Sequence, residues 1–171
     1  MLKAAIRAGS SEKSSVMKLV LEAAGWKDEI NQKEERAPLL LGGHLETAGG
    51  LKISYVPQDT SHLKGSLEEY AHTYGIDETL FKALLRKLDF SRTQFDKKME
   101  EYSGGQKKKV LIARSLCEQA HLYLWDEPLN FIDVFSRMQI EGLINRYHPT
   151  LLMVEHDRTF VEAVGAKVIR L

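Results

Sequence analysis

The sequence has little cysteine, no net charge and no long apolar stretch. Its single cysteine, Cys117, excludes an internal disulfide framework and fits a reducing cytosol. Lys plus Arg and Asp plus Glu both number 24, so the formal net charge of zero argues against a protein that mainly wraps a polyanion. No apolar run reaches the ~18 residues that a membrane span needs, and the N-terminus lacks a signal-peptide core. We therefore expect one cytoplasmic globular domain, 1–171, with no membrane insertion and no direct DNA contact.

Apolar periodicity indicates short strands that alternate with amphipathic helices. The expected strands are residues 2–6, 51–56, 121–125, 150–154 and 168–171, and the expected helices are 13–24, 66–74, 77–88, 104–119 and 135–147. In helix 77–88 we expect Asp77 as the N-cap and a buried stripe of Leu80, Leu84, Leu85 and Leu88. In helix 104–119 we expect the apolar positions Val110, Leu111, Ala113 and Leu116 to oppose Lys107, Lys108 and Arg114. This alternation predicts an α/β fold, a mostly parallel sheet with helices on both faces.

Polar side chains follow three of the predicted strands, at the points where those strands end. They are Gln58, Asp126, Glu127, Glu155 and His156. Ligands of open parallel sheets bind beyond the carboxyl ends of the strands. The convergence of an amide, carboxylates and an imidazole therefore predicts a binding site at this edge.

Ser103, Gly104, Gly105 and Gln106 open a predicted helix. A serine followed by two glycines exposes backbone N–H groups at the positive helix end, where an anion can approach closely. A plain N-cap with flexible glycines explains the same residues equally well.

The buried strand that precedes Asp126 and Glu127 ends in two adjacent acids, which is costly unless the acids serve a purpose. Asp126 suits Mg²⁺ coordination and Glu127 suits polarising an attacking water. A solvated surface turn is the alternative, and Pro128 fits it. His156 could equally be a satisfied loop histidine, and Asp133 an ordinary N-cap for the helix that follows it.

Together these segments resemble the ATP-binding cassette ATPases in order and in spacing. The resemblance rests on four motifs: Ser103–Gln106, Leu122–Glu127, Asn130–Asp133 and Glu155–Asp157. The variants Tyr-Ser-Gly-Gly-Gln-Lys-Lys-Lys, Asp-Glu-Pro-Leu-Asn and Glu-His-Asp are most similar to the ABC-F class, soluble twin-cassette ATPases that act on ribosomes. The run from Ser54 to Gly65 is similar to the second cassette of the antibiotic-resistance branch. The resemblance is dense over 51–171 and loose over 1–50.

The resemblance implies a P-loop NTPase-like fold with a helical subdomain at about 62–103, and it implies ATP and Mg²⁺ as cofactors. It makes Gln58 a Mg²⁺ ligand that senses the γ-phosphate, Asp126 the Walker-B acid, Glu127 the catalytic base and His156 the switch histidine. Ser103 and Gly105, with Gly104 and Gln106 beside them, would contact a nucleotide held by a second cassette of the same or a longer chain. Asp133 would lie at the interface between cassettes. The physics is compatible, because phosphoryl transfer needs positioning and charge stabilisation more than a nucleophilic side chain.

The phosphate loop departs from the family pattern. Lys13, Ser14 and Ser15 align with its end, and Lys13 and Ser14 could reach a phosphate and Mg²⁺. The positions that should be glycine carry Arg7, Ser10 and Glu12. Glu12 places a negative charge beside the expected triphosphate, at a cost of about 1 kcal/mol in water and several times more in a partly buried site.

The family's antenna sheet and first cassette have no counterpart in these 171 residues, so we expect a fragment or a decayed relative of a second cassette. A lone cassette holds two half-sites, and we therefore expect feeble ATP hydrolysis or none. Three functions stay open: an ABC-F-type ATPase linked to the ribosome in antibiotic resistance or translation, the nucleotide-binding subunit of a transporter, and a non-catalytic cassette with a decayed phosphate loop. The short stretch between Gln58 and Ser103 favours the first over the second.

Overall fold

The structure is a computed structural model that describes residues 3–7 and 50–170. The predictions made for Lys13, Ser14 and Ser15, and for the helix 13–24, lie outside the described residues.

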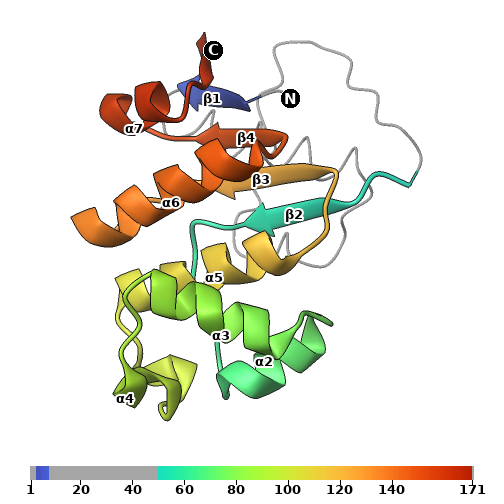
Figure 1. The fold of residues 1–171 in the computed structure, drawn as a ribbon, viewed down its shortest axis with the longest axis vertical. Helices are drawn as coiled ribbons and strands as arrows, with labels where there is room; N and C mark the ends of the chain where they lie inside the picture. Colours follow the sequence, from blue (N-terminus) through green and yellow to red (C-terminus); the bar gives the residue numbers. More distant parts are fainter. Residues whose placement is uncertain (1–2, 8–49, 171) are drawn as a thin grey trace, which may run out of the picture.

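A five-stranded parallel sheet forms the centre of the fold (Figure 1). Its strands are β1 (Lys3–Arg7), β2 (Ile53–Val56), β3 (Leu122–Asp126), β4 (Leu151–Val154) and β5 (Lys167–Arg170). Their order across the sheet is β2-β3-β4-β1-β5. Because all pairs are parallel, the carboxyl ends of the strands lie at one edge, as the sequence predicted.

The helices begin where the sequence supplies caps. They are α2 (Leu67–Thr73), α3 (Glu78–Lys87), α4 (Arg92–Phe95), α5 (Gly104–Cys117), α6 (Val134–Tyr147) and α7 (Arg158–Ala163), with a 3₁₀ turn at Met99–Glu101. Asp77, Asp133 and Asp157 each accept a hydrogen bond from the backbone N–H three residues later. These side chains satisfy amides that have no partner within the helix.

Helix α5 packs against β2 on one side and against α3 on the other. The helices between β2 and α5 gather below the sheet in Figure 1, and α2 precedes α3 there. Both α5 and α6 begin at the end of the molecule to which the arrowheads of β2, β3 and β4 point (Figure 1). The start of α5 therefore lies on the same side as the carboxyl ends of these strands.

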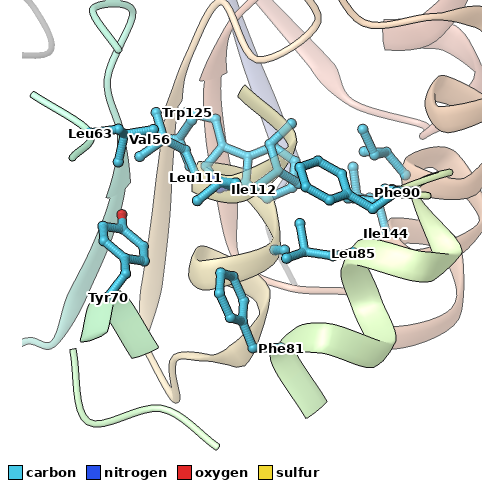
Figure 2. Close-up of a cluster of buried hydrophobic side chains, with 14 of the residues drawn as sticks. Val56, Leu63, Tyr70, Phe81, Leu85, Phe90, Leu111, Ile112, Trp125 and Ile144 are labelled. Carbon is cyan, nitrogen blue, oxygen red and sulfur yellow. The ribbon is translucent and has the colours of Figure 1, made fainter. Parts of the chain in front are cut away.

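One apolar core joins the sheet to the helices. Val56 of β2, Trp125 of β3, Leu111 of α5 and Ile144 of α6 are fully buried in it. Figure 2 shows Phe81 and Leu85 of α3 in the same cluster as Ile112 of α5. A continuous cluster of this kind holds the helical layer to the sheet through α5.

The buried face of α3 differs from the predicted stripe. Leu80 is exposed, and Phe81 and Leu85 are the buried positions. Leu88, the C-cap, is buried as predicted, and Leu84 is partly buried. The core selects the larger aromatic Phe81, which lies one position further along the helix.

The polar face predicted for α5 is wrong at two of its three residues. Lys108 and Arg114 are both 1% exposed. Arg114 donates to the carbonyl of Tyr55 and to Glu118 Oε1 at 3.1 Å, and its guanidinium lies 4.5 Å from the ring centroid of Tyr74. Helix α5 is sandwiched between β2 and α3, so both its faces are covered and charged positions there must find partners inside.

Two short helices and one 3₁₀ turn were not predicted: α4, the turn at Met99–Glu101, and α7. Each is six residues or shorter, which is too short to show apolar periodicity. No helix in the described residues has the length and apolarity to cross a bilayer.

Candidate functional site

Two side chains from neighbouring strands meet just beyond the carboxyl edge of the sheet. The Gln58 amide Nε2 donates to Glu127 Oε2 at 2.8 Å, across 69 positions of sequence. The parallel register of β2 with β3, which ends at Val56 opposite Trp125, brings them together. Gln58 and Glu127 therefore lie together at this edge of the sheet, as the sequence predicted.

Glu127 has an unusual backbone. Its φ is +45°, in the left-handed region that non-glycine residues rarely occupy. Its own N–H donates to the carbonyl of Val154 at 3.0 Å, and the Asn130 amide donates to its Oε2 at 2.6 Å. Strained backbone of this kind is concentrated at functional sites, because the surrounding structure must hold it. Here the carboxylate is aimed by two amide donors, Gln58 and Asn130.

His156 joins the same carboxylate from the end of β4. Its Nε2 lies 3.4 Å from Glu127 Oε1, and its side chain is 60% exposed. Glu155, which is buried, accepts from the backbone N–H groups of His156 at 2.7 Å and Asp157 at 3.0 Å. The turn that presents the imidazole is thus fixed by a buried carboxylate.

Asp126 is the last residue of β3 and is 7% exposed. Its backbone carbonyl accepts from the buried Lys108 ammonium at 3.1 Å. Burial lowers the pKa of Lys108 to about 8, and the nearby carboxylates of Asp126, Glu127, Glu155 and Asp59 oppose that lowering. Acids at the end of β3 are therefore adjacent to a cation that the sequence had assigned to solvent.

The start of α5 is capped from within. Ser103 Oγ accepts from the Gln106 N–H at 3.3 Å, and the Gln106 side chain accepts from the Ser103 N–H at 2.9 Å. Ser103 and Gly104 are exposed, so an approaching ligand can reach this helix end. These residues lie at the helix end expected for an anion site, and their geometry is also that of an ordinary capping box.

The segment after Glu127 packs onto the two glycines. A Cβ at Gly105 would lie 2.3 Å from the Phe131 carbonyl oxygen, and one at Gly104 would lie 3.5 Å from the Phe131 ring. Phe131 has a φ of +64° and is 85% exposed. The absence of a side chain at Gly105 is therefore required by the neighbouring backbone of this chain.

Asp133 ties the following helix to α5. Lys109 Nζ lies 2.7 Å from its Oδ2, and the Ser136 N–H donates to its Oδ1 at 2.8 Å. Desolvation raises the pKa of Asp133, but the hydrogen bonds from Lys109 and Ser136 outweigh it and hold that pKa at about 2. Asp133 is therefore the N-cap of α6, which the Sequence analysis gave as the alternative to a functional role, and it also forms an ion pair with α5.

Arg137 makes a second link, from α6 to the turn that carries His156. Its guanidinium pairs with both carboxylate oxygens of Asp157, one at 3.0 Å, and its Nε lies 3.1 Å from Glu141. Asp157 also caps α7 by accepting from the Phe160 N–H at 3.1 Å. Helix α6 and the loop after β4 are therefore mechanically joined.

The donor set suits a magnesium nucleotide. Carboxylate and amide oxygens are the ligands that Mg²⁺ prefers, and Mg²⁺ usually takes one or two protein groups together with phosphate oxygens. Within residues 50–170 no three His, Cys, Asp or Glu side chains cluster closely enough to cage an ion.

The structure thus brings together Gln58, Glu127 and His156, with Asp126 directly before Glu127 in the chain. It places Ser103–Gln106 at the start of α5, beside Phe131. Sequence reasoning gave Asn130 no role and placed Lys108 on a solvated face. The signal for Asn130 was available, since an amide three residues after a strand-end acid can turn back to it.

Comparison with known proteins places this geometry in a family. The family model described as ABC transporter matches residues 11–130. ABC transporter F family member 2 of Arabidopsis thaliana is 27% identical over 166 residues, which are 93% of this chain and 22% of that protein. The putative ATP-binding protein YdiF of Bacillus subtilis is 29% identical over 133 residues, 75% of this chain and 21% of that one. The chain thus spans about a fifth of the length of these two relatives.

Solved structures show the same fold. An archaeal ribosome recycling factor, in complex with a ribosomal stalk protein, gives a TM-score of 0.65 at 23% identity, covering 98% of this chain and 31% of that one. A putative cobalt transport ATP-binding protein gives 0.70 at 18% identity, covering 98% and 64%. The family model covers most of the chain, residues 11–130 of 171. The chain belongs to the ABC transporter family as an ATP-binding cassette ATPase domain, and it is ABC-F-like.

Proposed function

We propose that the chain binds Mg-ATP at the carboxyl edge of its sheet and contributes to ATP hydrolysis in a sandwich with a second cassette. The observation that carries the proposal is that the side chains of Gln58 and His156 both contact the carboxylate of Glu127. Gln58 and Asp126 are the proposed Mg²⁺ ligands, with Ser14 from the segment that also supplies Lys13 and Ser15 for the phosphates. Bound Mg²⁺ would neutralise phosphate charge.

In this proposal Glu127 accepts the proton of the attacking water. Gln58 and Asn130 hold its carboxylate in place. His156 lies within reach of the same region from β4 and would contact the γ-phosphate. Positioned general bases typically contribute about 10²–10⁴ in rate, so this assignment has a measurable consequence.

The second half-site would be the start of α5. Ser103, Gly104, Gly105 and Gln106 would face a nucleotide held by a partner cassette, with Asp133 at the junction between the two. Its exposed serine and the bare amides of the helix end support this role. The unit is then a single cassette, 1–171, with a helical subdomain at about 62–103, and the sandwich needs a second one.

We further propose a cytoplasmic, ribosome-linked role of ABC-F type, in antibiotic resistance or translation. The support is the similarity to an ABC-F member and the fold shared with a ribosome recycling factor. Co-sedimentation of the chain with ribosomes, compared with co-purification with transporter permease subunits, separates this role from that of a transporter subunit.

A non-catalytic cassette is the second candidate. It is favoured by Arg7, Ser10 and Glu12, which stand where the phosphate-loop motif has glycines. Binding of a fluorescent ATP analogue with Mg²⁺ tests both candidates when the parent chain is compared with Glu12→Gly. Tight binding by the parent that is unchanged in Glu12→Gly supports the ATPase and dismisses the decayed cassette. Binding that appears only in Glu12→Gly supports the decayed cassette.

A further inference from the structure

Lys108 is a buried charge that the proposed reaction does not use. It lies on α5, two residues after Gln106, and is 1% exposed. Its Nζ donates to the Pro57 carbonyl at 2.8 Å and to the Asp126 carbonyl at 3.1 Å, and lies 3.5 Å from the Gln58 carbonyl. One ammonium group is thus shared by backbone from two strand ends.

The position of these carbonyls explains why a lysine is accommodated. The β2–β3 ladder ends at Val56 opposite Trp125, and Pro57, the next residue, has no N–H to continue it. Carbonyls left beyond the last ladder bond need donors when they are buried. Lys108 supplies these donors from a third element, α5, and so joins the ends of β2 and β3 where hydrogen bonds between the two strands stop.

A buried ion is a poor source of stability, because desolvation offsets most of its attraction to its partners. An apolar side chain at this position would avoid the desolvation cost of the charge, although it would leave the carbonyls unpaired. The gain from Lys108 is therefore in geometry. It fixes Gln58 and the pair Asp126–Glu127 relative to the helix that begins at Ser103.

We propose that Lys108 is a positioning residue: from α5 it holds the backbone at Pro57–Gln58 and at Asp126–Glu127 in place. It thereby couples the helix that begins with the Ser-Gly-Gly-Gln segment to the Mg-nucleotide site. This inference rests on the proposed function for its consequence on nucleotide binding. Its structural half, the tether from α5 to two strand ends, stands without it. The nitrogen joins residues 51 and 18 positions away in sequence.

The test compares the 171-residue chain with Lys108→Met, which keeps the length of the side chain and removes its donors. Lys107→Met is the matched control, because Lys107 is the neighbouring, partly exposed lysine of the same helix. Ile140→Val, a core substitution in α6, controls for a general loss of stability. Amide hydrogen exchange is measured at Asp126 and Glu127, whose peptide carries the carbonyl bound by Lys108, and at β4.

We expect Lys108→Met to speed exchange at Asp126 and Glu127 by about tenfold while β4 exchanges as in the parent, because the Glu127 N–H that donates to Val154 shares its peptide group with the carbonyl that Lys108 holds. We expect Lys107→Met to change neither segment, and Ile140→Val to raise both by similar factors. The tether is overturned if exchange at Asp126 and Glu127 in Lys108→Met stays within twofold of the parent, or if it rises by the same factor there and at β4. If Lys108→Met does not fold, Lys108→Leu, which also removes the donors but has a smaller side chain, is judged by the same criteria.

A second readout tests the coupling to the site. Affinity for a fluorescent ATP analogue is measured with Mg²⁺ and with chelator. Relative to the parent, Lys108→Met should bind the analogue about tenfold more weakly in Mg²⁺ and with the same affinity in chelator. An equal loss in both conditions, or no loss, contradicts the coupling. If the parent itself binds no nucleotide, the proposed function and the coupling fail together, whereas the exchange experiment still decides whether Lys108 tethers the strand ends.

Discussion

Gln58 and Glu127 are hydrogen bonded at 2.8 Å although 69 residues separate them in sequence. The bond exists because β2 and β3 are parallel neighbours whose last ladder pair is Val56 with Trp125. The left-handed backbone of Glu127 then turns its carboxylate toward Gln58, Asn130 and His156. The relationship places an amide and a carboxylate at the edge where parallel sheets bind ligands.

The first prediction concerns how Glu127 is held. Asn130→Ala removes the amide that donates to Glu127 Oε2 at 2.6 Å. Because the carboxylate keeps its charge and loses part of its orientation, we expect ATP turnover to fall by about tenfold and affinity for Mg-ATP to stay within about twofold. Steady-state kinetics of the chain with a second cassette checks this. Glu127→Gln, the reference, should lose about 10²-fold or more. Unchanged turnover in Asn130→Ala would remove the amide from the account.

The second prediction separates the two glycines of α5. Gly105→Ala places a methyl group 2.3 Å from the Phe131 carbonyl oxygen, whereas Gly104→Ala makes an ordinary 3.5 Å contact with the Phe131 ring. We expect Gly105→Ala to lower the free energy of unfolding by about 1–3 kcal/mol and Gly104→Ala to change it by less than about 0.5 kcal/mol. Urea unfolding followed by circular dichroism measures both. Equal effects would show that the backbone after Glu127 does not pack on Gly105.

The third prediction is a pH dependence. The pKa of Asp133 is about 2 in the folded chain, below its ordinary value of 3.8. The unfolded state therefore binds more protons in that window, so the contribution of Asp133 to stability is present above about pH 4 and is lost as the pH falls through about 2. Because this carboxylate is about half exposed, we expect a small effect.

Lys109→Met removes its cationic partner and should flatten this part of the pH profile. The measurement is the unfolding free energy of parent and variant between pH 5 and about pH 2. A variant that loses stability over this range as steeply as the parent would mean that Lys109 does not hold the low pKa.

The fourth prediction tests the link between α6 and the turn that carries His156. Asp157→Ala removes both the N-cap of α7 and the partner of Arg137. We expect a loss of about 1–2 kcal/mol, mostly from the cap. Glu141→Ala, which removes the other partner of Arg137, an i,i+4 contact within α6, should cost less than about 0.5 kcal/mol. Thermal unfolding ranks the two, and a larger effect of Glu141→Ala would contradict the link.

The sheet, its parallel sense and the strand-end residues followed from the sequence because apolar strands and helix caps are local signals. Asp77 caps its helix as predicted, and Asp133 and Ser103 cap theirs as the alternative to a functional role had it. Lys108 and Arg114 were misplaced because their burial depends on elements that lie far away in sequence, β2 and α3. A lysine in an amphipathic pattern has the same appearance whether its amine reaches water or the backbone carbonyls of Pro57 and Asp126.

The candidate site likewise combines features that local sequence signals predict with features that depend on contacts distant in sequence. Gln58, Glu127 and His156 were predicted together, because parallel strands end at one edge. The left-handed φ of Glu127 and the close approach of Phe131 to Gly105 were beyond a sequence argument. Both are set by the chain between β3 and α6 where it packs on Gly105 of α5, and no residue type in that connecting segment indicates either feature.

We propose that a Mg-nucleotide binds where Gln58 and His156 meet the Glu127 carboxylate. Replacing Mg²⁺ by paramagnetic Mn²⁺ in the presence of ATP, and recording amide resonances of the 171-residue chain, tests it directly. We expect the amides of Gln58, Glu127 and His156 to broaden together and those of α3 to stay sharp. Saturating Mn-ATP that leaves these three amides sharp, or broadens resonances of α3 in their place, would contradict it.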